Sequence, residues 1–125
     1  MQRINFKIEA DPIPAARPRF GNGRTYQPSR NREFRDEVQR AAVVAMHGHE
    51  PMTGEICASL KLYRRFKPTA RNFGDADNHA KAILDGLNGI CYRDDAQIVK
   101  LTVEKRTDKT SPRAEIELTC AAVES

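Results

Sequence analysis

Four runs of alternating apolar residues constrain the fold of this 125-residue chain more than any other feature of its sequence. Every second side chain in each run is apolar, which is the pattern of a β-strand with one buried and one exposed face. We therefore expect four half-buried strands. The runs are Ile4 to Ala10, Ile56 to Leu62, Val99 to Val103 and Ala114 to Cys120.

Two further segments have helical periodicity. The first follows Ser29 and the second begins at Asp77, and both residue types are favoured at helix N-caps. Each segment carries an apolar stripe that could pack against a sheet. The stripes consist of Phe34, Val38, Ala41, Ala42 and Ala45 in the first segment and of Ala80, Ile83, Leu84 and Leu87 in the second.

The order of these segments predicts a single α+β domain over residues 1–125, with the order strand, helix, strand, helix, strand, strand. One antiparallel or mixed sheet of about four strands, with both helices on one face, would hide all six apolar faces. The link TDKTSP at 107–112 has hairpin length, so we expect the last two strands to pair antiparallel. Long loops are expected at 11–28 and 64–76.

Cysteine usage and hydropathy indicate where such a chain works. None of the three cysteines has C-x-x-C spacing, which favours a reducing compartment. The N-terminus does not resemble a signal peptide, and no segment approaches the roughly 20 apolar residues that a membrane span requires. We expect a soluble cytoplasmic protein that does not associate with membranes.

Charge is unevenly distributed along the chain, although the net charge is only +4. Residues 1–35 carry eight Lys/Arg against three acids, and residues 61–73 carry five Lys/Arg and no acid. Residues 74–97 reverse this balance, with five Asp against one Lys and one Arg. An acidic segment therefore lies between basic segments, and the basic segments suggest a nucleic-acid partner.

The acids of this segment form two tight pairs, Asp75 with Asp77 and Asp94 with Asp95. If the second helix starts beside the third strand, the pairs converge, and neighbouring carboxylates repel unless a cation joins them. Mg²⁺ suits such a sparse set because it commonly takes one or two carboxylates together with water and phosphate oxygens. Lys81, one turn after Asp77, could stabilise charge on a phosphate under attack. Metal-activated hydrolysis of a phosphodiester is the chemistry that this set suggests.

Structural explanations exist for each of these acids taken singly. Asp77 can be an ordinary N-cap, and Asp94 with Asp95 can be an ordinary turn. Asp77, Lys81 and Asp85, at i, i+4 and i+8, can be a solvated stripe on the second helix. The combination of acids on two elements, a lysine in phase and basic flanks favours the functional interpretation.

These motifs resemble those of a known family. D-A-D-N-H-A-K at 75–81, D-D-A-Q at 94–97 and R-P-R-F-G-N-G-R-T-Y at 17–26 are similar to the RusA family of Holliday-junction resolvases, found in bacteria and their phages and prophages. The resemblance implies a Mg²⁺-dependent endonuclease, with Mn²⁺ as a substitute, that works as a homodimer on four-way DNA junctions and makes paired symmetric nicks. It implies that Asp75, Asp77 and Asp95 hold the metal, with Asp94 as a less certain ligand, and that Lys81 is catalytic.

No small-molecule cofactor is expected beside the metal. The candidate DNA contacts share a position in or beside the basic segments, and the alternative for each cation is a solvated surface charge. Two other functions remain open: a branched- or duplex-DNA-binding module without chemistry, and a nuclease of broader scope that cuts flaps, forks or RNA. The candidate contacts are Arg17, Arg19, Arg24, Arg64, Arg65, Lys67, Arg71 and Asn78.

Overall fold

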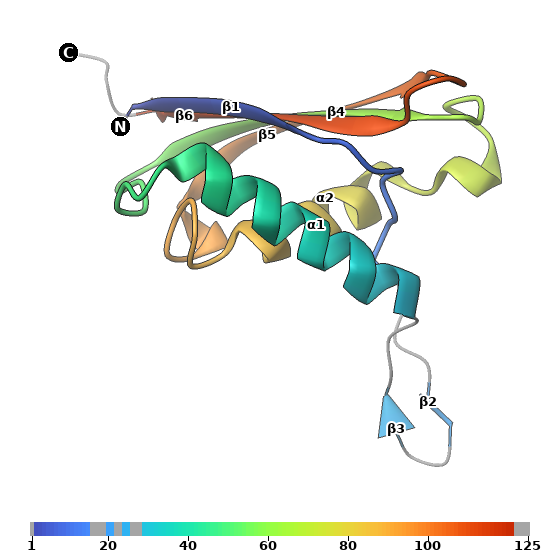
Figure 1. Cartoon of the computed structure of the whole chain (residues 1–125), viewed down its shortest axis with the longest axis horizontal. Coiled ribbons are helices and arrows are strands. Elements are labelled where there is room, and N and C mark those ends of the chain that lie inside the picture. Colours follow the sequence, from blue (N-terminus) through green and yellow to red (C-terminus); the bar gives the residue numbers. More distant parts are fainter. Residues whose placement is uncertain (1, 16–19, 22–23, 26–28, 122–125) are drawn as a thin grey trace.

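The computed structural model describes residues 2–15, 20–21, 24–25 and 29–121. Its order of main elements confirms the predicted strand, helix, strand, helix, strand, strand sequence of an α+β fold, and a two-residue strand pair, β2–β3, is added within the predicted loop (Figure 1). The elements are β1 (Arg3–Ile8), β2 (Phe20–Gly21), β3 (Arg24–Thr25), α1 (Ser29–Met46), β4 (Ile56–Arg64), the 3₁₀ turn η1 (Arg71–Phe73), α2 (Ala76–Leu87), the 3₁₀ turn η2 (Asp95–Gln97), β5 (Ile98–Thr107) and β6 (Arg113–Cys120).

The main sheet has the strand order β1-β6-β4-β5. β4 pairs with β5 in parallel and with β6 antiparallel, so the predicted antiparallel pairing of the last two strands is wrong: β4 lies between them. The apolar content of the strands explains the order. Alternate residues of β4 are buried along its whole length, which suits a central strand, whereas Val99 and Leu101 of β5 are 54% and 43% exposed.

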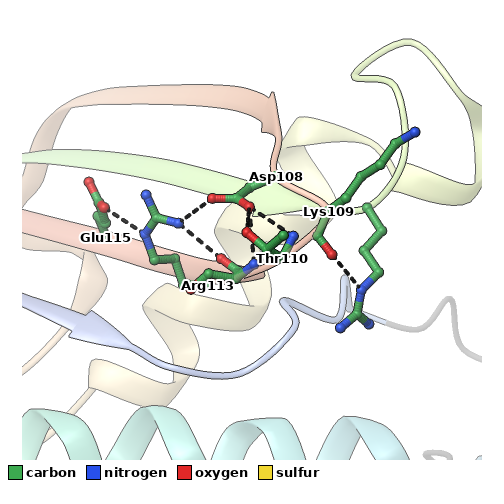
Figure 2. Close-up of polar contacts among 7 residues, drawn as sticks. Asp108, Lys109, Thr110, Arg113 and Glu115 are labelled. Atoms are coloured by element: carbon green, nitrogen blue, oxygen red, sulfur yellow. Dashed lines mark hydrogen bonds and ion pairs between the residues drawn. The ribbon is translucent and has the colours of Figure 1, made fainter.

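The chain between β5 and β6 crosses the end of β4, and polar contacts hold this crossing in place (Figure 2). The Asp108 backbone N–H donates to the carbonyl of Arg64 at 2.8 Å. The Asp108 carboxylate accepts from the backbone N–H groups of Thr110 and Ser111 and from Arg113 Nη1 at 2.9 Å. A five-residue link thereby spans a strand instead of closing a hairpin.

Both helices cover the same face of the sheet, as predicted (Figure 1). Strand register aligns the core in rows, one of which runs from Phe6 through Ile116 and Leu60 to Val103. α1 and α2 pack against each other closely at one glycine: a Cβ on Gly86 would lie 2.7 Å from a methyl carbon of Val38. Within the part of the chain that the structure describes, neither helix has the length and apolar character needed to cross a bilayer.

Candidate functional site

The first acidic pair lies at the start of α2. Asp75, rather than the predicted Asp77, occupies the N-cap position, with extended backbone angles of −74° and 144°, and its side chain makes no capping hydrogen bond. Asp77 lies in the first turn, where its Oδ1 accepts from the Asn78 backbone N–H at 2.9 Å. Both side chains are exposed, so their carboxylates are available to an external cation. Their negative charges are stabilised by the positive end of the helix dipole.

A polar stripe continues along α2 from Asp77 through Lys81 to Asp85. Lys81 Nζ lies 3.9 Å from Asp85 Oδ2, and the two side chains are 68% and 46% exposed. An ion pair with this length and exposure contributes little to stability. The Lys81 ammonium is therefore free to move toward a bound anion.

The second acidic pair sits in a loop that is fastened to α2 by Tyr92, whose buried hydroxyl donates to the Leu84 carbonyl at 2.7 Å. Asp94 is the N-cap of η2, and its carboxylate accepts from the Ala96 backbone N–H at 3.0 Å. Gln97 completes this capping box and also donates to the carbonyls of Met52 and Gly54. Asp94 is thus engaged by its own turn, in agreement with the structural alternative for this residue.

Asp95, the first residue of that turn, responds to charges on α2. The Asp94 side chain raises the pKa of Asp95, and the charge of Asp85 adds to this effect while that of Lys81 opposes it. The pKa of Asp94 is instead lowered, chiefly by the Ala96 backbone N–H that its carboxylate accepts. The second pair therefore lies within electrostatic range of the α2 stripe.

The donor chemistry of these residues fits a hard divalent ion, because exposed carboxylates are the ligands that Mg²⁺ prefers. The spacing is less favourable. Among the described residues, no three Asp, Glu, His or Cys side chains lie close enough together to hold a metal ion. The predicted convergence of Asp75, Asp77 and Asp95 into one cluster is therefore not formed in this arrangement.

Three consecutive backbone carbonyls precede Asp75, and each accepts from a side chain of another element. Arg64 Nη1 donates to the carbonyls of Asn72 at 3.1 Å and Phe73 at 2.7 Å, and Lys105 Nζ donates to that of Gly74 at 2.9 Å. The Phe73 carbonyl also lies 2.6 Å from His79 Nε2. We call this arrangement, Arg64 with Lys105 and His79 on the 72–74 carbonyls, the carbonyl clasp.

The clasp was not predicted, although the sequence contains a signal for it. Arg64 extends the apolar alternation of Leu60 and Leu62 by one step, and Lys105 extends the apolar alternation of Leu101 and Val103. A cation that occupies the next inward position of a strand is expected to find a buried partner. Strand register confirms this placement, because Lys105 pairs with Leu62 in the row of residues that faces the helices.

Arg64 was expected to contact DNA, and its surroundings argue against that role. Its side chain is only 6% exposed, and its Nε and Nη2 bind both carboxylate oxygens of Asp11, at 2.9 and 3.0 Å. With the carbonyl contacts added, the guanidinium is engaged on all sides. Arg64 is therefore a structural residue rather than a phosphate ligand.

His79 is buried on the inner side of α2. Burial is the main cause that lowers the pKa of His79, so its imidazole is neutral near pH 7. Because the Phe73 carbonyl can only accept, Nε2 carries the proton, and Nδ1 has no hydrogen-bond partner among the described residues.

The other candidate DNA contacts differ in how they are placed. Arg65, Lys67 and Arg71 are exposed, and Arg65 Nε donates to the Lys109 carbonyl at 3.2 Å. Asn78 is half-buried, and its carbonyl accepts from the Ala15 backbone N–H at 2.9 Å, which joins the start of the basic segment to α2. Arg24 lies in β3, and Arg17 and Arg19 fall outside the described residues.

Comparison with known proteins agrees with these motifs. The family model described as Endodeoxyribonuclease RusA matches residues 9–119, which is most of the chain. A relative of similar length, "Uncharacterized protein YqaN" of Bacillus subtilis (strain 168), is 29% identical over 138 residues that cover 93% of this chain and 95% of that protein. The matched range contains both acidic pairs, Lys81 and the carbonyl clasp. The chain belongs to the RusA family of endodeoxyribonucleases.

Proposed function

We propose that this chain is a Mg²⁺-dependent endonuclease that resolves four-way DNA junctions by paired symmetric nicks and works in the cytoplasm as a homodimer. The proposal rests on the local structure at the start of α2. Asp75 holds an N-cap position without using its carboxylate as a cap, and it lies in a chain that the family model matches. An N-cap aspartate normally caps its own helix, so an idle one is available for another role.

Each residue of the set has a distinct proposed role. Asp75, Asp77 and Asp95 would hold the divalent ion, which when bound supplies an activated water and a Lewis acid for phosphodiester hydrolysis. Lys81, with no strong partner, would bind a non-bridging oxygen of the scissile phosphate and offset its developing charge. Asp94 would hold the turn that presents Asp95.

DNA binding is assigned to basic residues around this set. Arg65, Lys67 and Arg71 are exposed and precede α2 in sequence. Arg17, Arg19 and Arg24 follow Ala15 in sequence, and the Ala15 backbone is bonded to Asn78 of α2. Phosphate contacts of this kind position a junction without reading its sequence, and they make binding strongly dependent on salt. A dimer fits the substrate because a four-way junction has approximate two-fold symmetry, so two related sites can reach strands of like polarity.

The direct test incubates purified protein with a synthetic four-way junction and with a linear duplex of the same arm sequence, in Mg²⁺ and in EDTA. We expect junction cleavage in Mg²⁺ alone and little cleavage of the duplex. Mn²⁺ is expected to support cleavage as well. Absence of junction cleavage in both ions would reject the proposal.

A non-catalytic DNA-binding module is the second candidate. It is favoured by the absence of a three-ligand group among the described residues. Under this alternative, junction binding would be independent of divalent ions and unchanged in Asp75→Asn. Flap and fork substrates in the same assay would identify a nuclease of broader scope.

A further inference from the structure

We propose that Arg64, together with Lys105, is a positioning residue that fixes the Asp75 carboxylate through the three backbone carbonyls before it. The inference rests on the proposed function of Asp75. It assigns a role in the metal site to two residues that do not touch the reacting atoms.

The contacts of the carbonyl clasp converge on a very short segment. Arg64 comes from the end of β4, His79 from α2 and Lys105 from edge strand β5, and their nitrogens lie 2.6–3.1 Å from the carbonyl oxygens of residues 72, 73 and 74. Hydrogen bonds from charged donors are shorter and stronger than neutral ones. The backbone immediately before Asp75 is therefore held by side chains from three elements: β4 and β5 of the sheet, and α2.

The segment has little room to shift. Gly74 has a φ of +95°, and a Cβ placed on it would lie 2.9 Å from both His79 Nε2 and Pro14 Cγ. Close packing on a backbone conformation that favours glycine leaves few alternative paths for the chain. The Asp75 side chain adds no capping bond to this restraint, whereas its backbone carbonyl accepts from the His79 backbone N–H at 3.1 Å.

The restraint depends on the shape of arginine rather than on charge alone. One edge of the guanidinium binds Asp11 through two nitrogens, and Nη1 binds two carbonyls on the other side. A lysine in its place would keep the charge but could not bind both partners with a planar fork. The Asp11 contact also keeps the buried charge paired, so Arg64→Lys is a milder change than removing the cation.

Arg113 provides a matched control. It is also an arginine at a strand end that is paired with carboxylates, in its case Asp108 at 2.9 Å and Glu115 at 2.8 Å (Figure 2). Its guanidinium also packs over the Tyr63 ring. Its hydrogen bonds go to Glu115, Asp108 and the Ser111 carbonyl, and these three residues lie outside the segment before Asp75. Arg113→Lys should therefore lower stability without altering the metal site.

The experiment compares wild type, Arg64→Lys and Arg113→Lys by three measurements besides the melting temperature. These are Mn²⁺ affinity of the DNA-free protein by calorimetry, junction affinity in Ca²⁺, and the single-turnover cleavage rate constant at saturating junction and Mg²⁺. For Arg64→Lys we expect Mn²⁺ affinity and the rate constant each to fall by about 10-fold or more, the range seen when partners behind a metal ligand are lost. Junction affinity should change less than about twofold, because no phosphate contact is removed.

Wild-type Mn²⁺ affinity and cleavage rate in a folded Arg64→Lys would overturn the proposal, as would equal losses in Arg113→Lys. If Arg64→Lys does not fold, Lys105→Met decides, since it removes the donor to the Gly74 carbonyl together with the ammonium 5.1 Å from the centre of the Phe73 ring. Lys100→Met on the same strand is its control. We expect a smaller loss of Mn²⁺ affinity for Lys105→Met than for Arg64→Lys, and wild-type affinity would again overturn the proposal. Failure of wild type to cut junctions would reject the proposed function, while the Mn²⁺ measurement would still test the clasp.

Discussion

The two acidic pairs differ in whether a carboxylate caps the helical turn that it begins. Asp94 caps the η2 turn with its carboxylate, and that turn is held further by Gln97. Asp75 occupies the equivalent cap position of α2 and makes no such bond, while the carbonyl clasp holds the backbone before it. An aspartate at a cap position is thus not always a capping residue.

The comparison also separates Asp94 from Asp95. The Asp94 carboxylate is the N-cap of η2 and accepts the Ala96 backbone N–H at 3.0 Å, so this side chain has a structural role in its own turn. The charges of Asp85 and Lys81 act in opposite directions on the pKa of Asp95, so Asp95 lies within electrostatic range of α2. We propose Asp95, the residue that the family resemblance implies, as the metal ligand of this pair.

The largest expected effect comes from breaking the first pair. Asp75→Asn should lower the junction cleavage rate more than about 100-fold, because losing a direct ligand should cost at least as much as losing a group behind it. Asp85→Asn, which removes only the weak contact to Lys81, should keep the rate within about threefold. Single-turnover cleavage in Mg²⁺ measures both variants, and equal rates for the two would remove the distinction between Asp75 and its neighbours.

A smaller contrast is expected within the second pair. Asp95→Asn should lower the cleavage rate about 100-fold, whereas Asp94→Asn should stay within a few-fold of wild type because asparagine is as good an N-cap as aspartate. Asp94→Ala, which cannot cap, should lower the melting temperature while leaving the metal ligand in place. The reverse order of rates for the two asparagine variants would make Asp94 the ligand.

The smallest expected effect concerns Asp108, a turn carboxylate that resembles Asp94 in serving local structure. Arg113 and the backbone N–H groups of Thr110 and Ser111 lower the pKa of Asp108 well below its usual value (Figure 2). Because this pKa is lower in the folded state, the carboxylate stabilises the fold at pH values above its unfolded-state pKa of ~3.9. The contribution is lost as the pH falls below that value.

Asp108→Asn should therefore lower the melting temperature by on the order of a few degrees at pH 7, with no loss of junction cleavage. The gap to wild type should be constant from pH 5 upward and shrink below about pH 4, where the carboxylate of the unfolded chain begins to take up a proton while that of the folded chain stays charged. Melting curves between pH 2 and 7 measure this gap, and a gap that widens on acidification would contradict the assigned role.

Much of the fold could be predicted because its elements are locally encoded. Alternation in β4 and β6 and the apolar stripes of α1 and α2 correspond to the buried positions that the structure shows. The pairing of β5 could not be predicted, because the length of the 107–112 link permits a hairpin as well as a crossing of β4. The pairing depends on which strand occupies the centre of the sheet, and that position is set by all the strands together.

The candidate site shows the same division. The family motifs identify Asp75, Asp77, Lys81 and Asp95, but the clasp that holds the first of these depends on contacts between residues far apart in sequence. Arg64 and Asp11 are 53 positions apart, and Lys105 and Gly74 are 31 apart. Counting basic residues assigned Arg64 to DNA, whereas its place in the strand alternation indicated burial.

The most direct test of the central claim maps the cleavage products of a four-way junction to the nucleotide, with wild type and Asp75→Asn in Mg²⁺. We expect symmetric nicks in two strands of like polarity with wild type and almost no nicks with Asp75→Asn. Equal cleavage by Asp75→Asn, or no junction cleavage by wild type in Mg²⁺ or Mn²⁺, would contradict the claim that the acids at the start of α2 cut DNA junctions.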